Sequence, residues 1–367
     1  MTPRIRRMGQ LLTAHIDGPL LTAILLLMAV GLLVIFSGSN QSYARITGQG
    51  VNMLVALGVM YVFANIPPHY LMRIALPIYV LGVLLLVGVA TVGEVVNGAR
   101  RWLHVGVTRI QPSELMKIAA PLMLAWYFAR YEASLRLRNY IVAAVLLLVP
   151  VLLVARQPDL GTALLITAGG CYVLFLAGLS WRIIGALALA GGASLPLLWS
   201  VMHDYQRQRV LTLLDPSQDR LGAGYHTIQS TIAVGSGGTL GKGWLQGTQT
   251  HLDFIPERTT DFIFAVFSEE FGFVGNIVLL VLFLLVIGRG VVITANAPNL
   301  FTRLFGGAIT LTFFTYSFVN MGMVSGILPV VGVPLPLISY GGTSLVTICL
   351  GMGILMSIQT HKKLVQT

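Results

Sequence analysis

Long apolar runs recur along the whole 367-residue chain, and they constrain its fold more than any other feature. Each run is continuous, with no alternation of polar and apolar residues, so a membrane β-barrel is excluded. Runs near the length of a bilayer crossing predict an all-α polytopic membrane protein of about ten transmembrane helices, in one integral membrane domain over 1–367. The runs cover residues 18–37, 50–64, 71–91, 113–129, 139–155, 161–178, 181–202, 262–288, 303–327 and 342–358.

The few charged residues favour one orientation of these helices. Only 10% of the residues are charged, and an N-terminus in the cytoplasm places most basic residues of the short connections on the cytoplasmic side. An even number of helices then brings the C-terminus to the same side. In this topology eleven of the 13 carboxylates lie on the outer side or near the outer helix ends. This mixed charge indicates polar chemistry at the outer face and argues against nucleic acid as a partner.

Two connections differ from the others. Residues 203–260, between the seventh and eighth spans, predict a large extracytoplasmic loop. Its glycine-rich part, 235–243, lacks the ending of a nucleotide-binding loop, and we expect flexible backbone whose amides approach an anionic headgroup.

Residues 328–341 are apolar but carry three prolines, which exclude a regular helix. Irregular backbone at membrane depth must be buried in protein or line a cavity, so this segment is expected to be re-entrant or cavity-lining.

Three predicted helices open with charged residues, all at the outer face. Glu114 and Lys117 are spaced i, i+3 after Pro112, and taken alone they are equally well explained as an ion pair within one helix. Asp159 alone is explained as an N-terminal cap. Asp261 opens a third helix, and two more glutamates follow it in the same span, more than capping requires. Three such entrances at one face indicate a functional cavity.

Such a cavity suits several activities. A carboxylate in an apolar wall has a raised pKa, which fits a general base at neutral pH. Neighbouring Arg and Lys residues can hold a phosphate leaving group, and the acids could instead hold a divalent cation. Histidines are scattered, and no Ser-His-Asp set is visible. From these residues alone a transferase, a lipid flippase and a proton-coupled transporter all stay open.

Six stretches carry a resemblance to a known family. They are Arg101-Trp102, QPSELMK at 111–117, QPDLGTA at 157–163, PERTTDFIFAV at 256–266, EEFG at 269–272 and GVPLPLISYGGTS at 332–344. With them the chain resembles, over essentially its full length, the SEDS family of bacterial membrane glycosyltransferases. The Pro256-Glu257-Arg258 sequence is similar to the elongation-type branch of that family. One departure is Thr259, where many members carry histidine, and we expect it to be tolerated.

The resemblance implies a SEDS-type fold and a peptidoglycan glycosyltransferase in the cytoplasmic (inner) membrane. Such an enzyme polymerises lipid II into glycan strands at the outer face during elongation and releases undecaprenyl pyrophosphate, with inversion at the anomeric carbon. Asp261 matches the catalytic aspartate of the family. Glu114, Lys117 and Asp159 match other functional positions, which shape the cavity, bind the headgroup or hold a metal. Weaker candidates for substrate binding are Arg101, Lys242, Glu257 and Arg258.

The resemblance implies no certain cofactor, but it does imply partners. A divalent cation, Mg²⁺ or Mn²⁺, stays an open alternative for the acids, with Asp261, Glu114 and Asp159 as the candidate ligands. The expected partners are a class B penicillin-binding protein, the transpeptidase that crosslinks the strands, and other membrane proteins of the elongation complex. Contact with the transpeptidase is expected through the eighth and ninth helices. A flippase for the lipid-linked precursor, or a proton-coupled transporter, is the alternative, although polar residues gather at one face instead of along a path across the bilayer.

Overall fold

A computed structural model describes most of the chain, and every predicted span forms a helix in it. The described residues are 14–361, except 97–98, 106–107, 158, 203–206, 208–209, 214, 217–222, 253 and 256. The ten helices are α2 (Gly18–Gly38), α3 (Tyr43–Ala64), α4 (Pro68–Val92), α5 (Pro112–Arg130), α6 (Leu137–Ala155), α7 (Leu160–Leu176), α8 (Trp181–Val201), α12 (Ile263–Ala295), α13 (Leu300–Val324) and α14 (Thr343–Thr360).

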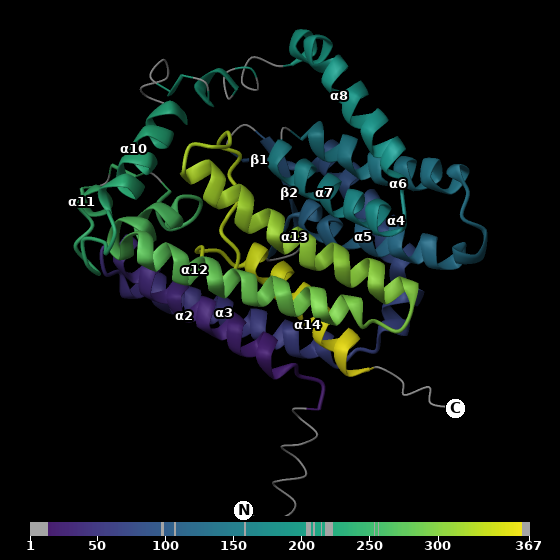
Figure 1. Ribbon diagram of the computed structural model, residues 1–367, viewed down its shortest axis with the longest axis horizontal. Helices are drawn as coiled ribbons and strands as arrows, with labels where there is room; N and C mark the ends of the chain where they lie inside the picture. Colours follow the sequence, from purple (N-terminus) through teal and green to yellow (C-terminus); the bar gives the residue numbers. More distant parts are fainter. Residues whose placement is uncertain are drawn as a thin grey trace, which may run out of the picture.

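These helices confirm the prediction of a polytopic α-helical membrane protein. Among the described residues, seven are long and apolar enough to cross a membrane alone, and α7 is a shorter apolar helix. Helices α12 and α13 lie side by side (Figure 1), with α2 packed against α12, and α7 and α5 packed against α13. Helix α14 packs against α3, so the bundle joins the two ends of the chain.

Local sequence explains where several helices begin. Pro68 and Pro112 occupy first turns, where the missing amide hydrogen costs no hydrogen bond. The carboxylate of Asp17 accepts a hydrogen bond from the amide of Leu20 at 3.0 Å and caps α2. The same side chain forms an ion pair with Arg289 of α12 at 2.5 Å.

A small antiparallel sheet between α4 and α5 adds to the predicted helices. Its strands are β1 (Glu94–Val96), β2 (Ala99–Val105) and β3 (Thr108–Ile110), in the order β1-β2-β3. Glu94 pairs with Trp102, and Leu103 pairs with Ile110. Strand β2 thereby brings Arg101 and Trp102 close to the start of α5.

Helix α12 is broken near its beginning, and the glycine-rich loop covers the break. Gly272 has φ 65° and ψ −162°, which no helix contains. The amides of Phe273 and Val274 donate to carbonyls of the loop, at Gly238 (2.9 Å) and Thr239 (3.0 Å). In return, amides of the loop donate to the carbonyls of Glu269 and Glu270, both at 3.0 Å. The break is therefore satisfied by protein, as membrane depth requires.

The prediction that backbone amides of the glycine-rich segment 235–243 approach an anionic headgroup is wrong for three residues. The amides of Gly241, Lys242 and Gly243 are taken up by carbonyls of the protein, so they do not face a headgroup. The large loop also contains α10 (Ala223–Ser236) and α11 (Thr248–His251). Helix α10 packs on α12 and α13 (Figure 1), with the Ser230 hydroxyl donating to the Val324 carbonyl at 2.9 Å. Other parts of 203–260 lie outside the described residues.

Candidate active site

The charged helix entrances meet in one cavity of about 430 Å³. Strand β2, the first turns of α5 and α7, the segment before α12, helix α13 and the proline-rich segment all contribute to its wall. Five of the eight candidate site residues line it, and they are Arg101, Glu114, Lys117, Asp159 and Asp261. Helix entrances that are far apart in the sequence therefore build a single polar site.

Asp261 lies two residues before α12, where the bundle fixes its backbone. The side-chain nitrogen of Asn320 donates to the Asp261 backbone carbonyl at 2.8 Å. Gly332 lies against the carboxylate, because a Cβ built there would be 3.3 Å from Asp261 Oδ2. Burial, and then the negative charge of Glu257, raise the pKa of Asp261 to about 6. Such a carboxylate is ionised at neutral pH and still basic enough to take a proton.

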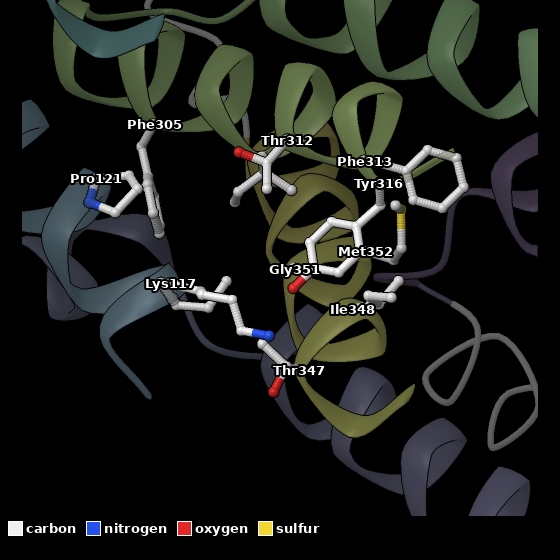
Figure 2. A pocket seen from close by; sticks show the side chains of 12 residues that line it. Lys117, Pro121, Phe305, Thr312, Phe313, Tyr316, Thr347, Ile348, Gly351 and Met352 are labelled. Carbon is white, nitrogen blue, oxygen red and sulfur yellow. The ribbon is translucent and has the colours of Figure 1, made fainter. Parts of the chain in front are cut away.

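Lys117 carries a buried positive charge at the floor of the cavity. Only 6% of the residue is exposed, and its ammonium lies 2.6 Å from Glu114 Oε1. The ammonium also lies over the Tyr316 ring, 5.2 Å from the ring centre, and Thr347 donates to the other Glu114 oxygen at 3.2 Å. Figure 2 shows Lys117 pointing towards Tyr316 and Thr347. The predicted pair on α5 is thus a meeting point of three helices.

Asp159 combines the two roles that the sequence left open. Its Oδ1 accepts the amide hydrogen of Thr162 at 3.2 Å, which caps α7. Its Oδ2 faces the cavity, 4.0 Å from Arg101 Nε and 3.4 Å from the side-chain nitrogen of Gln111. The carboxylate therefore holds the helix start and also places a negative charge beside the Arg101 guanidinium at the cavity wall.

The proline-rich segment 328–341 forms one wall of this cavity. The Tyr340 amide donates to the Thr259 carbonyl at 2.8 Å, and the Ser339 hydroxyl donates to the Thr260 carbonyl at 2.6 Å. Gly161 of α7 lies so close that a Cβ there would be 2.8 Å from the Val331 carbonyl oxygen. These contacts attach the segment directly to the backbone before Asp261.

Three candidate residues lie outside the cavity. Lys242 forms an ion pair with the fully buried Glu269 at 2.7 Å and donates to Thr248 at 2.7 Å. Glu257 and Arg258 line a separate polar cavity of about 340 Å³. Lys242 thus ties the large loop to Glu269, and among the described residues of that loop Thr260, next to Asp261, lines the cavity.

The two glutamates that follow Asp261 also have other tasks. Glu269 accepts hydrogen bonds from the amides of Gln249 at 2.8 Å and Thr250 at 3.1 Å, which holds the large loop on α12. Glu270 accepts a hydrogen bond from Ser37 of α2. Of the three carboxylates that the sequence groups in one span, Asp261 lines the cavity, while Glu269 and Glu270 hold α12 to the large loop and to α2.

The candidate metal ligands do not form a metal centre in the part of the chain that the structure describes. No group of three or more His, Cys, Asp or Glu residues is arranged there to hold an ion. Glu114 is taken up by Lys117 and Thr347, and one oxygen of Asp159 caps α7. The set of Asp261, Glu114 and Asp159 does not fit a divalent cation, and no chemical step is assigned to one.

Sequence reasoning missed three residues that contact the site. Tyr316 lines the cavity, Thr347 binds Glu114, and Asn320 binds the backbone of Asp261. A signal was available for two of them, because Tyr316 and Asn320 are polar positions spaced i, i+4 on one face of a mostly apolar helix.

Comparisons with known proteins agree on one family. The family described as "Cell cycle protein", which groups FtsW, RodA and SpoVE, matches residues 19–364. Peptidoglycan glycosyltransferase MrdB of Escherichia coli K12 is 51% identical over 351 residues, covering 95% of each chain. A structure described as the coordination of polymerization and crosslinking by a peptidoglycan synthase complex shares 34% identity and a TM-score of 0.81, covering 94% of this chain and 98% of that one. The rod shape determining protein RodA of Thermus thermophilus shares 30% identity and a TM-score of 0.70, covering 94% and 96%.

Proposed function

The chain belongs to the FtsW, RodA and SpoVE family of cell cycle proteins, and on this premise we propose that it is a peptidoglycan glycosyltransferase. It polymerises lipid II into glycan strands at the outer face of the inner membrane during cell elongation and releases undecaprenyl pyrophosphate. One observation carries the proposal: a single cavity gathers a basic carboxylate, Asp261, with two cationic side chains, Arg101 and Lys117.

These residues supply the two things that the reaction needs. The 4-hydroxyl of the acceptor sugar attacks the anomeric carbon of the donor sugar, and the bond from that carbon to the pyrophosphate oxygen breaks with inversion. Asp261 takes the hydroxyl proton as the new glycosidic bond forms. Arg101 and Lys117 face the negative charge that develops on the departing pyrophosphate. Glu114 presets the position of the Lys117 ammonium, and Asp159 lies beside the Arg101 guanidinium.

The proposed topology places both termini in the cytoplasm. In its support, the rings of His15 and His361 stack with their centres 4.1 Å apart, so α2 begins where α14 ends. Helix α10, in the large loop, packs against α12 on the side of the bundle away from these two helix ends, as expected for an outer loop (Figure 1). Reporter fusions at either end of the chain that are active only in the cytoplasm test this orientation, and a reporter active outside contradicts it.

We also propose a class B penicillin-binding protein as the partner. The observation in its support is an apolar groove of about 230 Å³ between α12 and α13, the eighth and ninth spans, where Phe314, Phe318 and Ile327 are exposed. A transmembrane helix of the transpeptidase fits such a groove. Phe318→Ala should weaken co-purification of the two proteins, and unchanged co-purification would move the interface elsewhere. The other elongation-complex proteins stay a prediction from the family.

Polymerisation and transport are separated by one experiment. The purified protein with its transpeptidase partner is given lipid II in detergent, where no membrane divides two compartments, and glycan strands are measured. Strands are the expected result for the transferase. A protein that makes no strands in detergent, but moves lipid II across vesicle membranes, would be the flippase alternative.

A further inference from the structure

We propose that Tyr316 and Asn320, one turn apart on α13, are positioning residues that fix the distance between the cation of the site, Lys117, and its base, Asp261. The inference rests on the proposed function, because it assigns a purpose to that distance: the ammonium must face the leaving pyrophosphate while the carboxylate faces the attacking hydroxyl. Residues at i and i+4 lie on one helix face, so a single rigid turn reaches both groups.

Tyr316 fixes the position of the Lys117 ammonium. The Glu114–Lys117 pair joins two residues of the same helix, so by itself it ties neither group to the rest of the bundle. The Tyr316 ring, 5.2 Å from the ammonium nitrogen, provides the tie to α13. Figure 2 shows the tyrosine hydroxyl on the side of the ring that faces Lys117. Thr347 provides the corresponding tie from Glu114 to α14.

The surroundings of Lys117 make this tie necessary. Lys117 also borders a small pocket lined mainly by apolar side chains, among them Pro121 and Phe305 (Figure 2) and Ile309. A lysine side chain is flexible, and its charge would be poorly solvated in that pocket. The Tyr316 ring stands at the boundary, since it lines both the pocket and the polar cavity. It keeps the charge at the polar side.

Asn320 fixes the position of the Asp261 backbone. Its side-chain nitrogen donates to two carbonyls, that of Asp261 at 2.8 Å and that of Val333 at 2.7 Å. Asn320 is fully buried, so neither hydrogen bond is exchanged for one with bulk water. One side chain thus fixes the backbone of the base and the loop that forms the wall beside it.

The two ends are also joined through packing. Tyr316 is 3% exposed and packs in a cluster with Leu165 of α7, Val319 of α13 and Val333 of the proline-rich segment. Val333 is the residue whose carbonyl Asn320 binds. The ring that holds the ammonium and the amide that holds the base therefore share a neighbour, and a shift of one would move the other.

A double-mutant cycle on kcat/KM for lipid II polymerisation tests this inference, in the full-length protein with its partner. Tyr316→Leu should lower kcat/KM about tenfold or more. Tyr316→Phe keeps the ring beside the ammonium but loses the hydroxyl that faces it, so it should recover part of that loss. The matched control is Phe301→Leu, an equally buried aromatic (3% exposed) on the same helix that lines neither cavity. It should stay within about threefold of the wild type.

The decisive comparison uses Lys117→Met, which removes the charge but keeps the volume. If Tyr316 acts through Lys117, adding Tyr316→Leu to this variant causes little further loss. If Lys117→Met is too slow to measure, the same cycle is run on the Kd of farnesyl pyrophosphate, a soluble probe of the pyrophosphate site. Tyr316→Met replaces Tyr316→Leu if the latter does not fold, as judged from its Tm.

Three results would overturn the inference. Tyr316→Leu could be as active as the wild type, or Phe301→Leu could lose as much kcat/KM as Tyr316→Leu. In the third, the fold-losses in kcat/KM of Lys117→Met and Tyr316→Leu multiply in the double variant, which would show that the two residues act independently. Asp261→Asn is measured in parallel to keep the two proposals apart. An inactive Asp261→Asn beside a fully active Tyr316→Leu rejects only the role of Tyr316. An active Asp261→Asn rejects the base on which the proposed function depends.

Discussion

Replacing Asp261 by asparagine should abolish activity and, at the same time, leave the fold as stable as before or more stable. The reason is that the bundle holds this carboxylate where its charge is disfavoured. Its pKa rises from 3.8 to about 6, mainly through burial. A shift of that size corresponds to at most ~3 kcal/mol of destabilisation at neutral pH. Because Asp261 borders an open polar cavity, about 1–2 kcal/mol is the expected value.

The pH dependence of this effect has a definite sign. Below about pH 4 the carboxyl group is protonated in the folded and the unfolded protein, so aspartate carries no penalty. Between about pH 4 and pH 6 the unfolded state ionises first, and the wild type loses stability relative to the variant. Above about pH 6 both states are ionised, and the difference stays constant.

The assay is thermal unfolding of both proteins in the same detergent from pH 4 to pH 8. The Tm of Asp261→Asn minus that of the wild type should be near zero at pH 4, rise through pH 6 and then level off. A variant that is less stable at every pH would show that Asp261 is a structural residue. A difference that does not change with pH would refute the raised pKa and, with it, the argument for a base.

Three further predictions use the same structure. Polymerisation by the wild type should rise with pH through about 6, as Asp261 ionises, and a profile that is flat from pH 5 to pH 8 would contradict this base. Gly332→Ala should lower the free energy of unfolding by about 1–2 kcal/mol, because φ is +73° there. It should also lower kcat at least tenfold, because the new methyl group lies 3.3 Å from the Asp261 carboxylate. Unchanged kcat would place the reaction elsewhere. Lys242→Ala should lower the free energy of unfolding by about 3 kcal/mol, because it leaves the buried Glu269 without its cation. It should keep the wild-type KM for lipid II, whereas Lys117→Ala should raise that KM. A raised KM for Lys242→Ala would show that Lys242 binds the substrate.

The membrane bundle could be predicted from sequence because its signal is local and continuous. Every apolar run became a helix, and the predicted SEDS-type fold agrees with the likeness to the peptidoglycan synthase complex. The sheet after α4 was missed although its sequence contains Asn97-Gly98, a dipeptide typical of tight hairpins. Its strands are short and lie between two dominant apolar runs, so the helical pattern masked them.

The candidate site was only partly predictable, because its contacts join distant parts of the chain. The spacing of Glu114 and Lys117 predicted their pairing, which is local. Nothing in the sequence indicates that Glu270 meets Ser37, 233 residues away, or that Lys242 meets Glu269 instead of the cavity. Such partners are set by how the helices pack, and a count of carboxylates in one span cannot distinguish a base from a structural anchor.

The first measurement to make compares lipid II polymerisation by the wild type, Asp261→Asn and Lys242→Ala, each purified with the transpeptidase partner. Loss of a general base typically costs about 10²–10⁴-fold, so Asp261→Asn should make almost no glycan while its Tm is unchanged or higher. Lys242→Ala should be less stable but active per folded molecule. Equal amounts of glycan from the wild type and Asp261→Asn would contradict the role of this cavity as the glycosyltransferase site.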